Sequence, residues 1–337
     1  MWHVIDVLRR SARRFDRRAL ATTTTAVALA LVAMLSPAAA FPERPIRVII
    51  PLPPGGAVDI VARLLQPHLE RALGKPLIIE NKAGASGIVG AATVATADPD
   101  GHTLLLVPTT FTINAAVHQK LPFDPIKSFE PIAIVGRNSL MTLVNPKVQA
   151  KTLKELAALA KAKPGALNYA TPGASSQAHL LLELWSSQAG IKMQHIPYRG
   201  GAPAVLATVT GEADMTLISP TASLTQIEAK TLRALATGGA TREEQLPDVP
   251  TTAESGFPDF KALQWIGLLA TGGTPKPIID RLNSEVQRAL QLPEVKARFA
   301  EQGMTVAGGP ARDFRALIEA EVRQWTEVAR KANIRVE

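Results

Sequence analysis

A strand that ends in prolines and glycines is the first segment whose residue types could bind a ligand. Val48 to Ile50 are apolar, Pro51-Leu52-Pro53-Pro54-Gly55-Gly56 follow, and a helical pattern begins at Ala57. Backbone N–H groups at a helix start carry partial positive charge, and glycines leave no side chain in front of them. The segment therefore predicts a carboxylate site, although an ordinary tight turn between a strand and a helix could use the same residues.

Two later segments repeat this pattern in the second half of the chain. Thr171-Pro172-Gly173-Ala174-Ser175-Ser176 adds hydroxyl groups to the turn, and Tyr198-Arg199-Gly200-Gly201-Ala202-Pro203 adds one cation. Open α/β sheets bind ligands at the carboxyl ends of their strands. Three such turns favour an anion-binding cleft over three unrelated connections.

Motifs for other chemistry are scarce. The sequence contains no Gly-x-Ser-x-Gly elbow and no Gly-x-x-x-x-Gly-Lys loop, which argues against a serine hydrolase and against phosphoryl transfer. A run of glycines lacks the spacing of a dinucleotide fingerprint and indicates close packing instead; its members are Gly84, Gly87 and Gly90. We therefore expect no cofactor.

Two pairs of polar residues could still form a site. His179 and Glu183 are four residues apart on a predicted helix and could share a metal, but no third ligand lies near them in sequence. Asp59 and Asp214 could act as paired carboxylates, yet Asp59 in the first turn of a helix already stabilises the helix dipole. We expect no metal and no catalytic residue.

Composition narrows the class of protein further. The 337 residues include no cysteine, which excludes disulfides, cysteine nucleophiles and thiolate metal sites. The net charge is +8, but residues 1–40 carry six arginines and two aspartates, so half of the surplus lies there. The remainder has no basic run that could follow a phosphate backbone. Nucleic acid is not an expected partner.

The first forty residues have the pattern of an export signal. Arginines from Arg9 to Arg18 precede an uncharged run, Ala19 to Leu35, and Ala38-Ala39-Ala40 resembles a cleavage site. We expect a mature protein that begins near Phe41 and lives outside the cytoplasm. An uncleaved membrane anchor is the alternative, and the paired arginines leave general secretion and the twin-arginine route both open.

The mature chain alternates between strand and helix patterns, which predicts an α/β fold with parallel strand pairing. A proline-rich passage follows the strand pattern at 103–107 and runs to Glu130. Strands are expected at 46–50, 77–80, 103–107, 167–170, 193–197, 214–219, 233–237 and 265–270, and helices at 58–73, 88–96, 153–163, 176–189, 203–210, 276–290 and 313–332.

Several specific motifs occur in a fixed order along the chain: Pro45-Ile46-Arg47, Pro51 to Asp59, Glu80 to Gly84, Pro99 to Leu104, Leu121 to Pro125, Pro197 to Gly200 and Leu246 to Thr251. With these motifs, residues 41–330 resemble the extracytoplasmic solute receptors of tripartite tricarboxylate transporters, the Bug family. The resemblance implies a periplasmic binding protein of type II topology, whose two α/β lobes enclose a carboxylate. It places the first lobe at 41–142 plus 264–337 and the second at 143–263.

The resemblance also implies partners and site residues. The partners would be a small carboxylate and a membrane transporter with one large and one small integral subunit, and we expect the receptor itself to be a monomer. The implied ligand-binding residues are Leu52, Pro54, Gly55, Gly56, Asp59, Thr109, Thr110, Thr171, Gly173, Ser175, Ser176, His179, Arg199, Gly200, Ala202, Pro203 and Asp214. The family usually has glycine where Ser175 stands, so ligand size is open at this position.

Two other functions remain possible on sequence alone. The same cleft could belong to an enzyme with Asp59 or His179 as a base, although the chain offers no nucleophile, cofactor loop or metal set. It could also belong to a sensor that presents its closed form to a membrane signalling partner. Backbone amides recognise any carboxylate, so the sequence does not identify the ligand.

Overall fold

The computed structural model describes residues 41–118, 120–174 and 176–335. Every element below belongs to one compact unit, residues 44–337. The predicted export signal lies outside the described residues. Within the described ranges, no helix is both long and apolar enough to cross a membrane.

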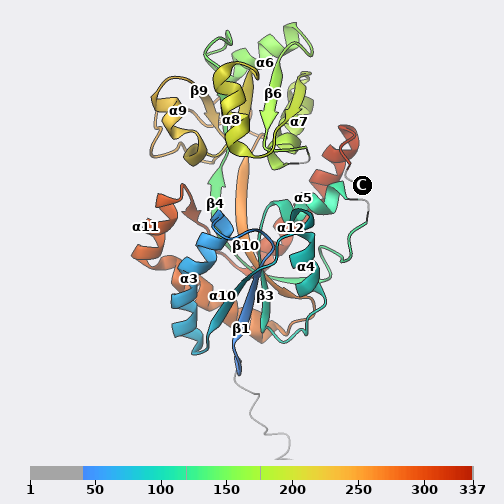
Figure 1. The fold of residues 1–337 in the computed structure, drawn as a ribbon, viewed down its shortest axis with the longest axis vertical. Helices are drawn as coiled ribbons and strands as arrows, with labels where there is room; N and C mark the ends of the chain where they lie inside the picture. Colours follow the sequence, from blue (N-terminus) through green and yellow to red (C-terminus); the bar gives the residue numbers. More distant parts are fainter. Residues whose placement is uncertain (1–40, 119, 175, 336–337) are drawn as a thin grey trace, which may run out of the picture. The chain divides into compact units, whose positions relative to one another are not determined.

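The described residues form two sheets (Figure 1). The first has six strands in the order β11-β4-β10-β3-β1-β2. Their bounds are β1 Ile46–Ile50, β2 Leu77–Asn81, β3 Thr103–Pro108, β4 Phe129–Ser139, β10 Leu263–Thr271 and β11 Thr305–Val306. β1 is parallel to both β2 and β3, as the alternation of strand and helix patterns predicts. β10 is antiparallel to both β3 and β4, and β11 is antiparallel to β4, so the predicted parallel pairing does not extend to these strands.

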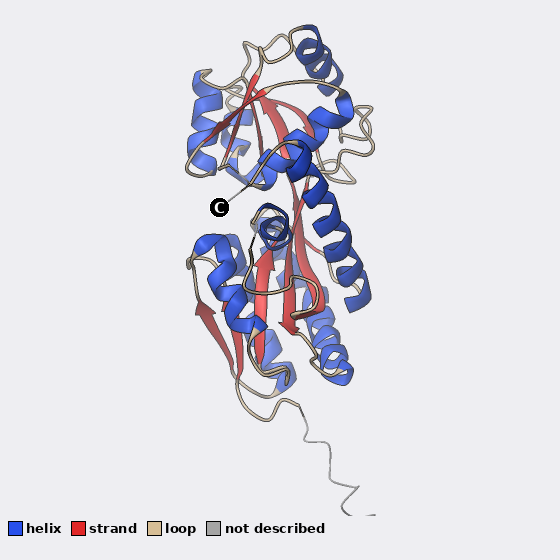
Figure 2. Ribbon diagram, turned by 90° about the vertical axis from the view of Figure 1, so that its right-hand side faces the viewer, coloured by secondary structure: helices blue, strands red, loops and turns tan. Residues whose placement is uncertain are grey.

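Helices cover both faces of this sheet (Figure 2). They are α3 Ala57–Leu73, α4 Ile88–Ala95, α5 Thr110–Val117, α10 Lys276–Gln291, α11 Pro293–Glu301 and α12 Ala311–Lys331, with the short helix η1 at Ala85–Gly87. α10 and α11 are separate helices because Pro293 begins the second one, where its missing N–H costs nothing. We call this sheet and its helices the first lobe.

The second sheet has five strands in the order β7-β6-β8-β5-β9. Their bounds are β5 Met141–Val144, β6 Asn168–Thr171, β7 Gln194–Pro197, β8 Met215–Ile218 and β9 Arg233–Thr237. β6 is parallel to β7 and β8, whereas β5 is antiparallel to β8 and β9. The helices are α6 Leu153–Ala162, α7 Gln177–Ala189, α8 Gly201–Thr210 and α9 Leu224–Glu228, with η2 at Pro220–Ala222. This sheet and its helices form the second lobe.

The proline-rich passage 108–130, for which the sequence indicated no helix or strand, is partly helical. It contains α5, whose sequence TFTINAAV has several β-branched residues and therefore a weak intrinsic preference for helix. Burial of Phe111, Ile113 and Val117 stabilises the helix instead. β4 begins at Phe129 and is buried along most of its length, and β5 follows it directly.

Two connections join the lobes and touch each other where they cross. Leu140 N donates to Ala262 O at 2.7 Å, and Gly238 N donates to Leu140 O at 2.8 Å. A β-carbon on Gly238 would lie 2.6 Å from the Cα and N atoms of Ala262, so only glycine fits. Beside the crossing, Glu243 accepts hydrogen bonds from the hydroxyls of Ser139 and Thr237.

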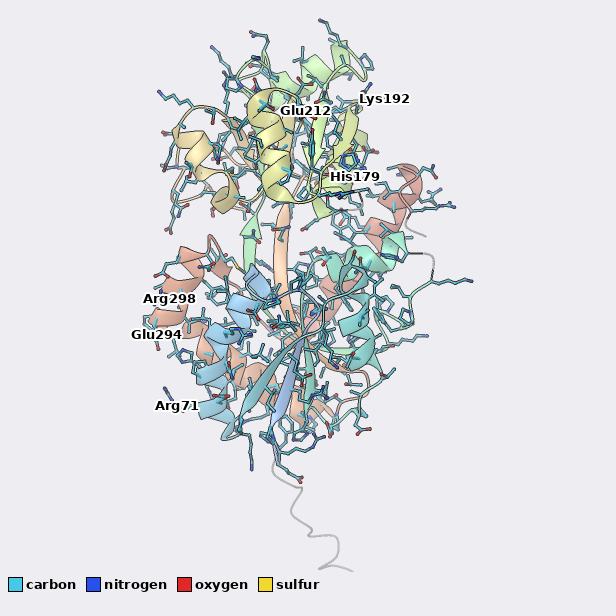
Figure 3. The ribbon with its side chains drawn as sticks, in the orientation of Figure 1. Arg71, His179, Lys192, Glu212, Glu294 and Arg298 are labelled. Atoms are coloured by element: carbon cyan, nitrogen blue, oxygen red, sulfur yellow. The ribbon has the colours of Figure 1, made fainter. Side chains whose placement is uncertain are left out.

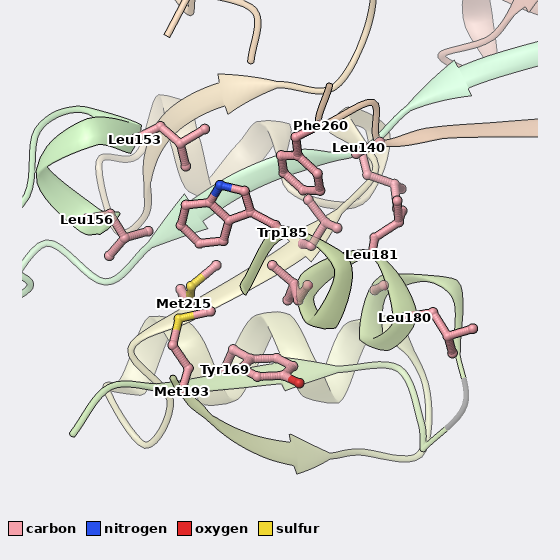
Figure 4. Packing of buried hydrophobic residues seen from close by; sticks show 14 of the residues in the cluster. Leu140, Leu153, Leu156, Tyr169, Leu180, Leu181, Trp185, Met193, Met215 and Phe260 are labelled. Atoms are coloured by element: carbon pink, nitrogen blue, oxygen red, sulfur yellow. The ribbon is translucent and has the colours of Figure 1, made fainter. Parts of the chain in front are cut away.

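The last helix contributes to both hydrophobic cores. Phe314 and Ile318 of α12 pack in the core of the first lobe. Trp325 and Val328, further along the same helix, pack in the core of the second lobe, which surrounds the fully buried Trp185 (Figure 4). The end of α12 therefore joins the lobes in addition to the two crossing connections.

Candidate functional site

The loop after β1 is held in place by a carboxylate at the start of α3. Asp59 is 4% exposed, and its Oδ2 accepts from Gly55 N and from Arg63 Nε, both at 3.0 Å. The hydrogen bond from Arg63 is the main cause that lowers the pKa of Asp59, and the Gly55 N–H bond adds to it against the effect of burial. Asp59 is thus ionised and already bonded, which suits a residue that shapes the loop better than a general base.

A small pocket lies at the carboxyl ends of β1 and β3. Leu52 and Thr110 line it together with Pro51, Ser86, Gly87, Ala91, Val107, Pro108, Phe111, Asn114 and Phe123. Asn114 Nδ2 donates to Ser86 O at 2.9 Å and so fixes α5 against the glycine-rich turn. A β-carbon on Gly90 would lie 2.7 Å from Pro51 Cα, so this glycine permits close packing, as its spacing indicated.

The two threonines after β3 have different roles. Thr109 is 1% exposed; its Oγ1 accepts from Trp265 N at 2.8 Å, and its N–H donates to Trp265 O at 3.0 Å. Thr110 is half-buried and lines the pocket. Thr109 therefore fixes the end of β3 to β10, whereas Thr110 is the threonine that a ligand could reach.

The two second-lobe turns are hydrogen-bonded to each other. Tyr198 N donates to Thr171 O at 2.9 Å, and Gly200 N donates to Pro172 O at 3.0 Å. Thr171 is fully buried, and its Oγ1 donates to Gly173 O at 3.0 Å. Gly200 has φ +116°, which side chains disfavour. The turns form one rigid edge, on which three predicted residues are exposed: Arg199, Ala202 and Pro203.

Ser176 is the N-cap of α7, and its Oγ accepts from His179 N at 3.3 Å. The Ser176 side chain is half-buried. Because the oxygen is the acceptor in this cap, the hydroxyl hydrogen can still be donated to a ligand. Ser175 lies outside the described residues.

A stacked pair of histidines lies beneath this helix start (His179 is labelled in Figure 3). The ring centroids of His179 and His195 are 3.6 Å apart with an interplanar angle of 18°, and His195 Nε2 is 2.6 Å from Thr171 Oγ1. Burial is the main cause that lowers the pKa of each imidazole to about 4, and for His179 the neighbouring His195 contributes to this shift. Both rings are therefore neutral at pH 7. His195 was not expected from the sequence, because nothing local marks its contact with α7.

Gln177, which the sequence analysis also missed, connects the second lobe to β10. It is the first residue of α7, and its Nε2 donates to Leu263 O at 2.7 Å. Trp265, which bonds Thr109, lies two residues further along β10, so the carbonyls of residues 263 and 265 point to the same side of the strand. The end of β3 and the start of α7 therefore meet on one edge of β10.

Asp214 is not brought to these strand ends. Its Oδ2 accepts from Asn168 N at 2.8 Å, and it directly precedes β8. Asn168 begins β6, whereas Thr171 ends it, so Asp214 lies at the opposite edge of the sheet. The structure therefore does not bring Asp214 together with Thr171 and the other predicted residues at the carboxyl ends of the strands.

Glu183, the possible metal partner of His179, has a different bonding partner in the structure. Glu183 accepts a hydrogen bond from the Tyr169 hydroxyl, and burial, followed by this bond, raises the pKa of Tyr169. Across the described ranges, no group of three or more His, Asp or Glu side chains could hold a metal ion. What the strand ends offer is backbone amides, hydroxyls and the exposed Arg199, a set that can bind an anion.

Known proteins have a similar sequence and a similar fold. Residues 61–334 match the family model described as tripartite tricarboxylate transporter family receptor. Protein BugT of Bordetella pertussis is 35% identical over 321 residues, which cover 95% of this chain and 98% of BugT. The solved structure of MatC from Rhodopseudomonas palustris with bound malate is 32% identical, with a TM-score of 0.68, and covers 86% of this chain and 99% of MatC. Rpa4515 of the same organism, solved with adipate, is 29% identical, with a TM-score of 0.72 and coverages of 88% and 99%.

Proposed function

Since the chain belongs to the receptor family of tripartite tricarboxylate transporters, we propose that it captures a small carboxylate between its two lobes. Its two α/β lobes have the fold of type II periplasmic binding proteins, and its relatives are solute receptors. The observation that carries the proposal is the meeting of Thr109 and Gln177 on one edge of β10, because it brings the strand ends of both lobes to a common place.

The ligand chemistry follows from the groups at these strand ends. Malate and adipate, which are bound in the two neighbouring structures, are both dicarboxylates. A few hydrogen bonds from amides and hydroxyls to a carboxylate, at roughly 1.5–3 kcal/mol each, would account for the roughly 8 kcal/mol of micromolar binding. A clamp of several arginines is not required.

We assign two kinds of role to the predicted residues. Those that could contact the ligand are exposed or half-buried: Leu52, Pro54, Gly55, Gly56, Thr110, Gly173, Ser176, Arg199, Gly200, Ala202 and Pro203. Asp59, Thr109, Thr171 and His179 are buried and hold these residues in place. Asp214 has no part in the proposed site.

The cellular setting belongs to the same proposal. The receptor is exported, loses residues 1–40, and works in the periplasm as a monomer. It delivers its ligand to a membrane transporter with one large and one small integral subunit. The lobes are residues 41–142 plus 264–337 and residues 143–263, with the end of α12 packed against the second.

A panel of carboxylates tests the binding function. The purified mature protein is screened by thermal shift against mono-, di- and tricarboxylates, and each hit is titrated by calorimetry and then incubated and followed by NMR. At least one acid should bind at micromolar concentration and remain chemically unchanged. Turnover of a bound acid would show an enzyme, and the absence of any shift would refute carboxylate capture.

A further inference from the structure

Gln177 holds a buried hydrogen-bond acceptor at the start of α7. Its side chain is 4% exposed, and Nε2 donates to Leu263 O at 2.7 Å. Only the NH₂ group of an amide can donate to a carbonyl, so this bond fixes which end of the amide faces β10. The other end, Oε1, is buried and has no hydrogen-bond partner in the part of the chain that the structure describes.

A buried polar atom without a partner requires an explanation. Proteins rarely leave such an acceptor unpaired, because the atom loses its bond to water and gains nothing in return. Oε1 accepts but cannot donate, so the missing group must be a donor such as a hydroxyl. This acceptor lies on the first residue of α7, the helix at whose start the proposed ligand is bound, and this position suggests where the donor comes from.

A carboxylate held by the start of α7 brings its own substituents close to Gln177. The N–H groups of the first helical turn and the Ser176 hydroxyl would bind the carboxylate oxygens. The carbon next to that carboxylate, with any hydroxyl it carries, would then lie beside the first residue of the helix. A ligand without the hydroxyl would leave Oε1 unpaired in a closed site.

We propose that Gln177 determines specificity, by accepting a hydrogen bond through Oε1 from a hydroxyl next to the ligand carboxylate. The receptor then prefers 2-hydroxycarboxylates to unsubstituted acids of the same length. The inference rests on the proposed function, because it needs a carboxylate at the start of α7. A site that hydrogen-bonds a substrate hydroxyl discriminates strongly against the analogue that lacks it, so the preference should be at least tenfold.

Matched pairs of acids test the preference in the parent protein. Calorimetry compares L-malate with succinate, 2-hydroxyglutarate with glutarate, and 2-hydroxyadipate with adipate, and the pair of the length that binds is used further. The hydroxylated acid should bind at least tenfold more tightly. Equal affinities within the pair, or tighter binding of the unsubstituted acid, would overturn the proposal, and a water molecule would then be the partner of Oε1.

Two variants then assign the preference to Oε1. Gln177→Met removes both the donor and the acceptor at nearly constant length, and the ratio of the two affinities should fall to near one. Gln177→Glu removes the donor to Leu263 but keeps an oxygen at the Oε1 position. It should therefore weaken the binding of both acids and retain most of the ratio between their two affinities. Each variant is judged by the ratio of its affinities for the two acids. Loss of the Leu263 hydrogen bond, or general charge repulsion, weakens both acids' binding alike and therefore cancels in this ratio.

The outcomes distinguish failure of this inference from failure of the proposed carboxylate capture. If Gln177→Met keeps the affinity ratio of the parent, or Gln177→Glu loses it, a group other than Gln177 Oε1 binds the ligand hydroxyl. The assignment to Gln177 is then wrong, while the proposed capture of a carboxylate stands. If melting curves show that Gln177→Met does not fold, the ratio in Gln177→Glu decides. If the parent binds no carboxylate of the panel, both the inference and the proposed function fail.

Discussion

Replacement of Ser176 by aspartate separates the structural role of the α7 cap from its proposed role in binding. Aspartate caps helices about as well as serine and can accept the bond that His179 N donates to Ser176 Oγ at 3.3 Å. A negative charge at a helix start is itself stabilising by about 0.3–1 kcal/mol. Ser176→Asp should therefore melt at or slightly above the temperature of the parent protein.

The same charge should oppose the ligand. Two unit charges about 4 Å apart repel by about 4 kcal/mol at an effective dielectric constant near 20. Ser176 is half-buried, so solvent screening lowers this repulsion, and about 2–4 kcal/mol is expected. At about 1.4 kcal/mol per tenfold change, the dissociation constant should rise by roughly 30-fold to 1,000-fold.

The assay is calorimetric titration with a carboxylate that the parent binds, together with melting curves of the unliganded proteins. Thr152→Asp is the matched control, because Thr152 caps α6 in the same way, accepting from Glu155 N at 3.1 Å. It adds the same charge away from the proposed site, so its affinity should match that of the parent. Unchanged affinity and melting in Ser176→Asp would refute the assignment of the α7 start to the site.

Three further changes test the supports of the site. His179 and His195 have folded pKa values of about 4 against a usual 6.5, so protonation favours the unfolded chain; stability is full above pH 6.5 and falls as the pH drops toward 4. At pH 5 the free energy of unfolding should be about 2 kcal/mol lower than at pH 7, a value already reduced because His195 is partly exposed. Melting curves over this pH range should show that His195→Gln is less sensitive to acid than the parent, and equal sensitivity would contradict this explanation. Gly238→Ala should cost about 1–3 kcal/mol of unfolding free energy, because its new β-carbon has no room at the crossing; a urea midpoint equal to that of the parent would disprove this. Asp59→Asn should loosen the loop after β1 and weaken ligand binding several-fold in calorimetry, whereas the exposed Asp280→Asn should not; equal affinities in both variants would remove Asp59 as a support.

Eight of the eleven described strands and most of the longer helices could be predicted from local sequence patterns, whereas β4, β5 and β11 were not predicted. A continuous apolar run such as 104–107 suits a strand buried on both faces, and the amphipathic pattern of α10 suits a surface helix. α5 could not be predicted, because its stability comes from burial of Phe111 and not from helix propensity. Strand direction was also hidden, since β10 and β5 become antiparallel only through their partners.

The turns of the candidate site were visible in the sequence, whereas its contacts between separate elements were not. Proline and glycine spacing marked all three loops, because few other residues permit such turns. The stacking of His179 on His195 and the hydrogen bond from Gln177 to Leu263 join residues from separate elements, so no local sequence pattern predicts these contacts. For Asp214 the sequence showed the position beside a strand, but it did not show at which end of the strands in the sheet this residue lies.

The sharing of α12 between two cores affects how the chain should unfold. Proteins with separate cores can lose one lobe while the other persists, which appears as two transitions in denaturant. Here the first lobe cannot release Phe314 and Ile318 without disturbing the helix that also places Trp325 in the second core. Unfolding should therefore be one cooperative event, with Trp265 in the first core and Trp185 in the second reporting the same midpoint. The last helix of the chain makes the stability of each lobe depend on that of the other.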